Sequence, residues 1–126
     1  RDFPGTLIVR NHLGLPADRS AEGLAGWRDA MARFAAAPNV RVKLSGCCVP
    51  RQRWTPELQA PVVLEAIRLF GPERCMVASN FPVDGLLATY DEIMGGMRAI
   101  IAGLSDASQR RILSGTAAEV YRLPAP

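Results

Sequence analysis

The stretch Pro-Asn-Val-Arg-Val-Lys-Leu-Ser-Gly, residues 38–46, decides the fold. Two turn-forming residues precede its apolar, β-branched run 40–44 and two small residues follow it, a pattern typical of a buried strand. Similar runs, Thr6–Val9 and Cys75–Ala78, stand on either side of it at intervals of about 34 residues. The chain therefore predicts three short strands.

Segments with helical periodicity lie between these strands. The first segment carries apolar residues at three- and four-residue spacing: Leu24, Trp27, Met31 and Phe34. Ser20 is its predicted N-cap, and Pro38 ends it. In the second segment Thr55 is the predicted N-cap, Pro56 takes the first helical position and Gly71 follows the last turn.

More helices are predicted after the third strand. One runs from about Leu86 to Ala102, and close packing against a neighbour is the expected reason for the Gly95–Gly96 pair inside it. Two short helices follow. Ser105 caps the first and Gly115 ends it, while Thr116–Glu119 has the spacing of a capping box for the second.

Alternation of strands and helices favours right-handed βαβ units and a parallel sheet. The strands are apolar on both faces, so they need cover on both sides and would leave two open edges by themselves. A complete (β/α)₈ barrel needs about 250 residues. We therefore predict an α/β chain whose single partial domain, residues 1–126, is three βα units cut from a larger barrel.

Composition excludes several classes of function. The net charge is +3, but the fourteen arginines are scattered and form no basic stripe, which argues against nucleic-acid binding. No apolar run approaches the roughly 20 residues that a membrane helix requires. No Gly-x-Gly-x-x-Gly or P-loop pattern supports a nucleotide-binding module.

The cysteines are Cys47, Cys48 and Cys75, an odd number without Cys-x-x-Cys spacing. Adjacent cysteines rarely bridge each other, so we predict a reducing, cytoplasmic compartment and interpret the thiols as small buried side chains. Cys47 and Cys48 follow a predicted strand, which leaves a catalytic thiol as an alternative. Such a thiol would lack the usual base, because His12 is the only histidine.

Polar residues follow each predicted strand, where parallel barrels place their reacting groups. His12 could ligate a metal, act as a general base or donate to a carbonyl oxygen, and a structural histidine is the alternative. Lys43 is the only lysine in the sequence. Either the protein needs a primary amine at this position, or the lysine is there by chance. Asn80 cannot ionise and can only hydrogen-bond or coordinate weakly. Asp84 could reach the same strand-end site as Asn80, or it could simply form a turn.

Six segments in order carry a resemblance: Asn11–Pro16, Trp27–Met31, Pro38–Gly46, Phe70–Arg74, Ser79–Asp84 and Thr116–Leu123. Together they resemble the amidohydrolase-related family called amidohydrolase 2. Its members are predicted metal-dependent hydrolases with the TIM-barrel fold, and they include lactonases for sugar-acid lactones and for lactones from aromatic degradation.

The resemblance implies that the strands are the sixth, seventh and eighth of the barrel, followed by C-terminal helices. His12 matches the family's histidine at the sixth strand end, a metal ligand. Asn80 stands where many relatives have the aspartate of a Ser-Asp-Trp-Pro motif. The resemblance thus implies a divalent metal, zinc, that is weakly bound or absent.

The implied reaction is hydrolysis of a carboxylic ester or lactone. Water would be activated by a carboxylate or a weakly bound metal while His12 and strand-end donors polarise the carbonyl group. The catalytic residues expected are His12, Asn80 and Asp84. The substrate-binding residues expected are Arg10, Lys43 and Ser45.

The implied partner is a small-molecule substrate, and self-association stays open. Two alternatives to the hydrolase are an inactive fragment and a decarboxylase of the same superfamily.

Overall fold

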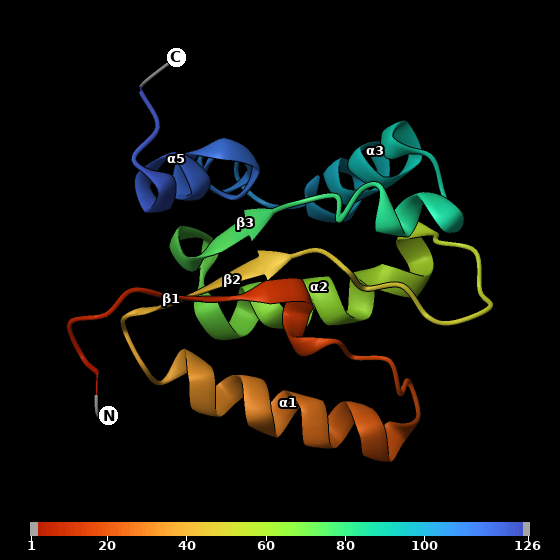
Figure 1. Cartoon of the computed structure of the whole chain (residues 1–126), viewed down its shortest axis with the longest axis horizontal. Helices are drawn as coiled ribbons and strands as arrows, with labels where there is room; N and C mark the ends of the chain where they lie inside the picture. The colour runs from red at the N-terminus through yellow and green to blue at the C-terminus, as the bar shows by residue number, and fades with distance from the viewer. Residues whose placement is uncertain (1–2, 125–126) are drawn as a thin grey trace.

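The computed structural model describes residues 3–124. Within them β1 (Ile8–Arg10), β2 (Val40–Leu44) and β3 (Cys75–Val77) form one sheet in the order β1-β2-β3. Both pairings are parallel, with Val42 opposite Arg10 on one side and Cys75 on the other. The three arrows accordingly point the same way in Figure 1. The predicted parallel α/β architecture is confirmed.

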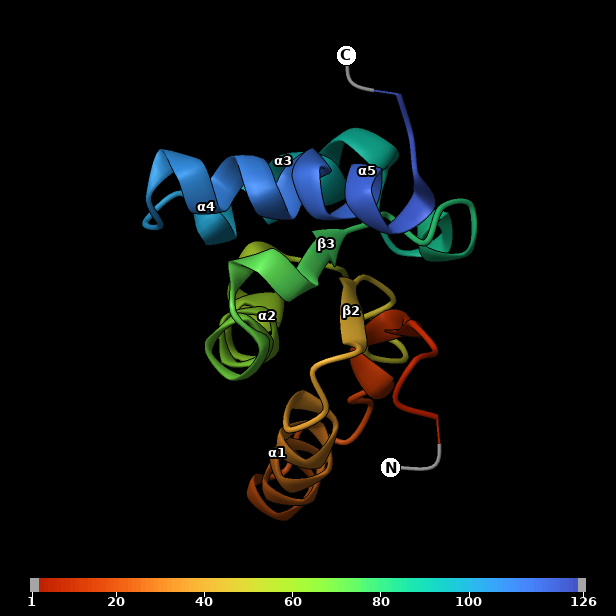
Figure 2. The ribbon, with the colours of Figure 1, turned by 90° about the vertical axis from the view of Figure 1, so that its left-hand side faces the viewer.

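Helices cover one side of the sheet and continue beyond its β3 edge (Figure 2). Helices α1 and α2 pack on each other, α2 packs on β2 and α3, and the C-terminal helices pack on β3. Their bounds are α1 Ala21–Ala35, α2 Pro56–Phe70, α3 Tyr90–Ile101, α4 Asp106–Arg110, η4 Arg111–Gly115 and α5 Thr116–Tyr121.

The central strand β2 divides the sheet into two chemically different faces. Val40, Val42 and Leu44 are buried in the core shared with the helices. Because side chains alternate along a strand, Arg41 and Lys43 lie on the opposite face. Both are half-buried, so the face away from the helices carries the charged groups of the sheet's centre.

The predicted caps of the first two helices are confirmed. The Ser20 side chain accepts from the Gly23 amide at 3.0 Å, and that of Thr55 accepts from the Leu58 amide at 3.3 Å. Gly71 takes a positive φ of 77° after α2, which explains the glycine there. Helix α2 runs unbroken from Pro56.

Several element boundaries differ from the prediction, and β3 ends at Val77 rather than Ala78. β1 covers Ile8–Arg10 rather than Thr6–Val9, because residues 8–10 pair with residues 40–42 of β2. Helix α3 begins at Tyr90 rather than near Leu86. Residues 83–86 form the 3₁₀ turn η3 (Val83–Leu86), and Thr89 and Glu92 form a capping box at the true start.

Ser105 caps α4 as predicted, because its side chain accepts from the Ser108 amide at 3.3 Å. The predicted boundary between the last two helices was wrong. Gly115 keeps helical torsions (φ −60°, ψ −43°), so the chain passes from α4 through the widened turn η4 into α5 without a break. The Thr116 hydroxyl makes no cap. It is buried and donates to the carbonyl oxygens of Pro72 and Glu73 at 3.3 Å, which ties α5 to the turn before β3.

None of the helices within residues 3–124 is long and apolar enough to cross a membrane.

Candidate active site

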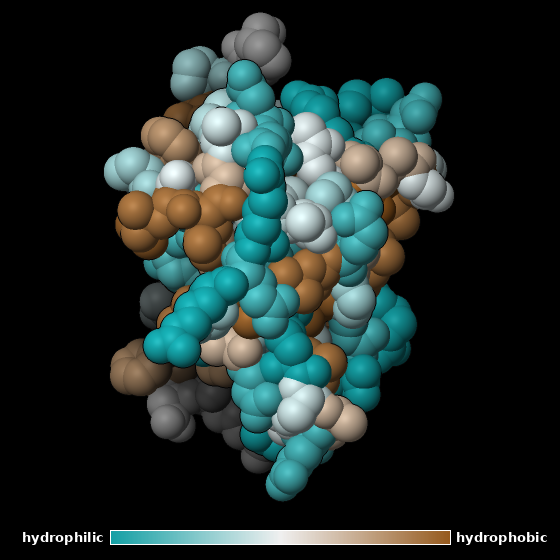
Figure 3. All heavy atoms as spheres, turned by 90° about the vertical axis from the view of Figure 1, so that its right-hand side faces the viewer, coloured by the Kyte–Doolittle hydropathy of each residue, from teal (hydrophilic) through white to brown (hydrophobic). Residues whose placement is uncertain are grey.

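The carboxyl ends of the strands open on one face of the molecule. Figure 1 shows all three arrows pointing to the right, and Figure 3 views the molecule from that side. Apolar areas lie there between polar ones (Figure 3). The loops after β1, β2 and β3 hold all but two of the predicted site residues, so this face is the candidate active site.

His12 stands on a left-handed turn directly after β1. The turn has φ values of 53° at His12, 51° at Leu13, 72° at Gly14 and 57° at Leu15. Left-handed torsions cost roughly 1–2 kcal/mol for each residue other than glycine. The Trp27 ring nitrogen donates to the Leu13 carbonyl oxygen at 2.7 Å, and the fully buried Leu13 side chain anchors the turn. Strain held in this way is typical of functional sites.

Ser45 fixes the His12 ring from the neighbouring strand end. The His12 Nδ1 atom lies 3.0 Å from the Ser45 Oγ atom, and Ser45 is buried. Gly46, with φ of 57°, lets the backbone pass directly beside the imidazole. When Nδ1 donates its proton to Ser45, Nε2 carries the lone pair that can take a proton or bind a metal.

Asn80 and Asp84 form a second pair, after β3. The Asn80 Nδ2 atom donates to the Asp84 Oδ1 atom at 2.7 Å. Asn80 has a φ of 56°, a conformation that asparagine tolerates better than most residues. Asp84 is only 4% exposed, so its carboxylate depends on polar neighbours such as Asn80 for much of its solvation.

His12 and Asn80 follow the two strands that flank β2, namely β1 and β3. Two inter-strand spacings of about 4.8 Å separate β1 from β3, which leaves roughly 10 Å between the backbones that carry His12 and Asn80. Lys43 belongs to the central strand β2, where it pairs in register with Met76 of β3. Its side chain lies on the sheet face away from the helices.

Arg10 does not join these residues. It is paired in register with Val42, on the face covered by helices, and its guanidinium group lies 5.4 Å from the ring centre of Phe34 in α1. The structure therefore brings together His12 and Ser45, and Asn80 and Asp84, while it directs Arg10 toward α1.

The cysteines are free and largely buried. Burial raises the pKa of Cys47 to about 12, and burial together with the neighbouring Asp84 carboxylate raises the pKa of Cys48 to about 12. Burial also raises the pKa of Cys75 to about 12. Near neutral pH each thiol keeps its proton, so none of them has the thiolate character of a nucleophile.

Sequence patterns missed Arg19, which joins two loops of the site. Its Nη2 atom donates to the Cys47 carbonyl oxygen at 2.8 Å and to the Gln59 Oε1 atom at 3.0 Å. Gln59 is fully buried in α2, and burial lowers the pKa of Arg19. These partners lie 28 and 40 residues away, and no local motif signals contacts of that kind.

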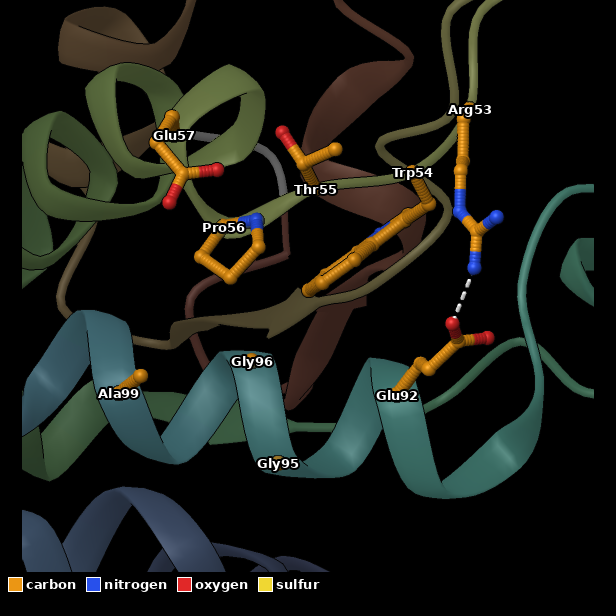
Figure 4. Close-up of a pocket in the computed structure, with 9 residues that line it drawn as sticks. All are labelled: Arg53, Trp54, Thr55, Pro56, Glu57, Glu92, Gly95, Gly96 and Ala99. Atoms are coloured by element: carbon orange, nitrogen blue, oxygen red, sulfur yellow. Dashed lines mark hydrogen bonds and ion pairs between the residues drawn. The ribbon is translucent and has the colours of Figure 1, made fainter.

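A separate pocket of about 440 Å³ lies between the start of α2 and the middle of α3 (Figure 4). Trp54 reaches across it to Gly96, where any Cβ atom would overlap the indole ring. Arg53 and Glu92 form an ion pair at its rim. None of the predicted site residues lines this pocket.

The described residues supply too few ligands for a catalytic zinc site. Residues 3–124 contain no group of three His, Cys, Asp or Glu side chains placed to share a metal ion. Catalytic zinc usually has three protein ligands. His12 offers one nitrogen, and Asn80 offers only a neutral carbonyl oxygen, so these residues do not fit the metal by themselves.

Parallel βα units with polar side chains at the strand ends define part of a (β/α)₈-barrel enzyme. Solved structures agree with this class. A crystal structure of an amidohydrolase from Burkholderia multivorans with bound HEPES superimposes with a TM-score of 0.86 at 35% identity, covering 92% of this chain and 44% of that one. A crystal structure of an amidohydrolase from the same organism, with bound zinc, gives a TM-score of 0.85.

The chain belongs to the amidohydrolase family, whose model matches residues 1–123. It is 42% identical over 123 residues to the uncharacterized protein y4mH of Sinorhizobium fredii, covering 98% of this chain and 41% of that protein. It is 38% identical over 131 residues to an L-fucono-1,5-lactonase of Burkholderia multivorans, covering 94% and 44% respectively. The chain thus spans less than half the length of these curated relatives.

Proposed function

We propose that the chain contributes His12, Ser45 and Asn80 to the active site of a hydrolase that opens a lactone or a related carboxylic ester. The hydrogen bond between His12 and Ser45 carries the proposal, because it fixes the only imidazole at the carboxyl edge of a family barrel. The lactonase name of the 38% identical relative supports the substrate class, and a sugar-acid lactone is the favoured substrate.

In the proposed reaction, the oxygen of a water molecule bonds to the lactone carbonyl carbon while Nε2 of His12 takes one of its protons. The resulting tetrahedral intermediate then breaks the bond between the carbonyl carbon and the ring oxygen. The same proton passes from His12 to the departing alkoxide, so the product is a hydroxy acid. Such proton transfer by a positioned histidine contributes typically 10²–10⁴-fold to a rate.

The other residues act on binding and orientation. The carbonyl oxygen of the Asn80 side chain accepts a hydrogen bond from the attacking water. The Lys43 ammonium group, on the sheet face away from the helices, attracts the negative charge that develops on the carbonyl oxygen or a carboxylate of the substrate. Asp84 accepts a hydrogen bond from the Asn80 side chain, so its role in the proposed reaction is to orient Asn80.

Zinc enters the proposal only through the family. One amidohydrolase relative binds zinc in its crystal structure, and His12 would be a single ligand of such an ion in the complete gene product. The remaining ligands would come from outside the described residues. No step of the proposed reaction depends on them.

The test offers the complete gene product a panel of sugar-acid and aromatic-derived lactones. Hydrolysis is measured as proton release, with and without a chelator. His12→Ala should lower kcat by about 100-fold or more. Ser114→Ala, an exposed serine in η4, is the matched control and should leave kcat unchanged. Unchanged turnover in His12→Ala would remove His12 from the mechanism, and no turnover of any lactone in the panel would overturn the proposed function.

A further inference from the structure

Three backbone hydrogen bonds hold Asp84 in the turn η3. Its backbone amide donates to the Asn80 carbonyl oxygen at 3.1 Å, and its own carbonyl oxygen accepts from Leu87 at 3.0 Å and Ala88 at 3.2 Å. These bonds fix the backbone of η3 around it. Its carboxylate is buried beneath this turn and accepts from the Asn80 side chain.

This contact fixes the orientation of the Asn80 side-chain amide. An amide has one accepting and one donating end, whereas an ionised carboxylate can only accept. Asp84 therefore takes the amino group, and the Asn80 carbonyl oxygen must point away from it. A neutral amide at position 84 would accept or donate equally well and would impose no such direction.

We propose that Asp84 is a positioning residue that orients the Asn80 side chain so that its carbonyl oxygen, and not its amino group, is presented to the substrate and the attacking water. The inference rests on the proposed function for its catalytic meaning. The hydrogen bond and its direction stand independently of that function.

The same contact predicts that an aspartate at position 80 is unfavourable in this chain. Two carboxylates at the observed oxygen–nitrogen distance of 2.7 Å would repel each other and share one proton. Exchange of the two residues removes the repulsion. In Asn80→Asp with Asp84→Asn, the new amide at 84 donates to the new carboxylate at 80, whose second oxygen still points toward the substrate.

The test compares four forms of the complete gene product: wild type, Asn80→Asp, Asp84→Asn and the double exchange. We expect Asp84→Asn to lower kcat about tenfold with little change in KM, the usual size of a lost orienting contact. Asn80→Asp should be less active than wild type, and the double exchange should recover most of the loss. Asp29→Asn, an exposed carboxylate in α1, is the control and should behave as wild type.

Thermal unfolding of the same four proteins gives a readout that does not need activity. Asn80→Asp should lower Tm, and the double exchange should restore it, because only the single variant sets two carboxylates against each other. Recovery of Tm without lactone turnover in any form would reject the proposed function and keep the pairing. Wild-type kcat in Asp84→Asn, higher kcat in Asn80→Asp, or no recovery of Tm in the double exchange would overturn the positioning role.

Discussion

The backbone of Gly46 passes so close to His12 that a Cβ atom at position 46 would lie 2.6 Å from the imidazole Cγ atom. Gly46→Ala should therefore push the imidazole out of its place and also strain a backbone with φ of 57°. We expect kcat of the complete gene product to fall at least tenfold, and the free energy of unfolding to fall by about 2 kcal/mol.

Gly26→Ala is the control for this substitution, because Gly26 lies inside α1 with open space where its side chain would be. It should keep wild-type kcat and gain stability of up to about 1 kcal/mol. Steady-state kinetics and urea unfolding measure both effects. Wild-type kcat in Gly46→Ala would show that His12 does not need its observed position.

Ser45→Ala tests the orienting partner of His12. Its loss leaves Nδ1 without its partner and frees the ring, so we expect a fall in kcat of about 10- to 100-fold with a smaller change in KM. Ser45→Thr keeps the hydroxyl group and should retain more activity than the alanine variant. Equal kcat in wild type and Ser45→Ala would reduce Ser45 to a packing residue.

The elements that sequence patterns predicted to the residue are those with strong local signals. β2 keeps the bounds Val40–Leu44, and α2 starts and ends where Thr55, Pro56 and Gly71 indicated. Local signals also misled where tertiary contacts decide. Gly115 suggested a helix end, but Thr116 binds the carbonyl oxygens before β3 and the helix continues.

For the candidate site, strand ends predicted which loops lie together but not the contacts within them. His12, Ser45, Asn80 and Asp84 all lie at the carboxyl edge, because parallel strands bring their ends together. That Ser45 pairs with His12 rather than with a residue of the third loop follows from side-chain directions. Those depend on the left-handed turn at His12, which no sequence pattern in the chain announces.

The glycine pair in α3 should respond unequally to alanine. Gly95 faces open space, so Gly95→Ala should stabilise the protein by up to about 1 kcal/mol through helix propensity. Gly96 touches the Trp54 ring, so Gly96→Ala should destabilise it by about 1–3 kcal/mol. Urea unfolding measures both, and the same sign for the two variants would contradict the packing around Trp54.

Buried thiols should make the fold sensitive to alkali. The pKa of Cys75 is about 12 in the fold against an ordinary value of 9.0, so between these pH values the unfolded chain binds fewer protons than the folded one. Stability from this group is complete below pH 9 and falls as pH rises, by up to about 1.4 kcal/mol per pH unit for each such thiol.

Urea unfolding at several pH values between 8 and about 10.5 checks this prediction. Cys75→Ala should show a shallower loss of stability with pH than wild type, although it is less stable at pH 8 because a buried side chain is shortened. Parallel pH dependences in the two proteins would contradict the raised pKa. Thiol reagents should also label native Cys75 only when the protein unfolds.

Because Asn80 and Asp84 share one hydrogen bond, their positions should change together during evolution rather than one at a time. A single base change can turn an asparagine codon into an aspartate codon, yet the intermediate would set two acidic side chains against each other. Lineages with an acid at position 80 should therefore carry an uncharged residue at 84. The hydrogen bond across this four-residue turn therefore predicts epistasis between the two codons.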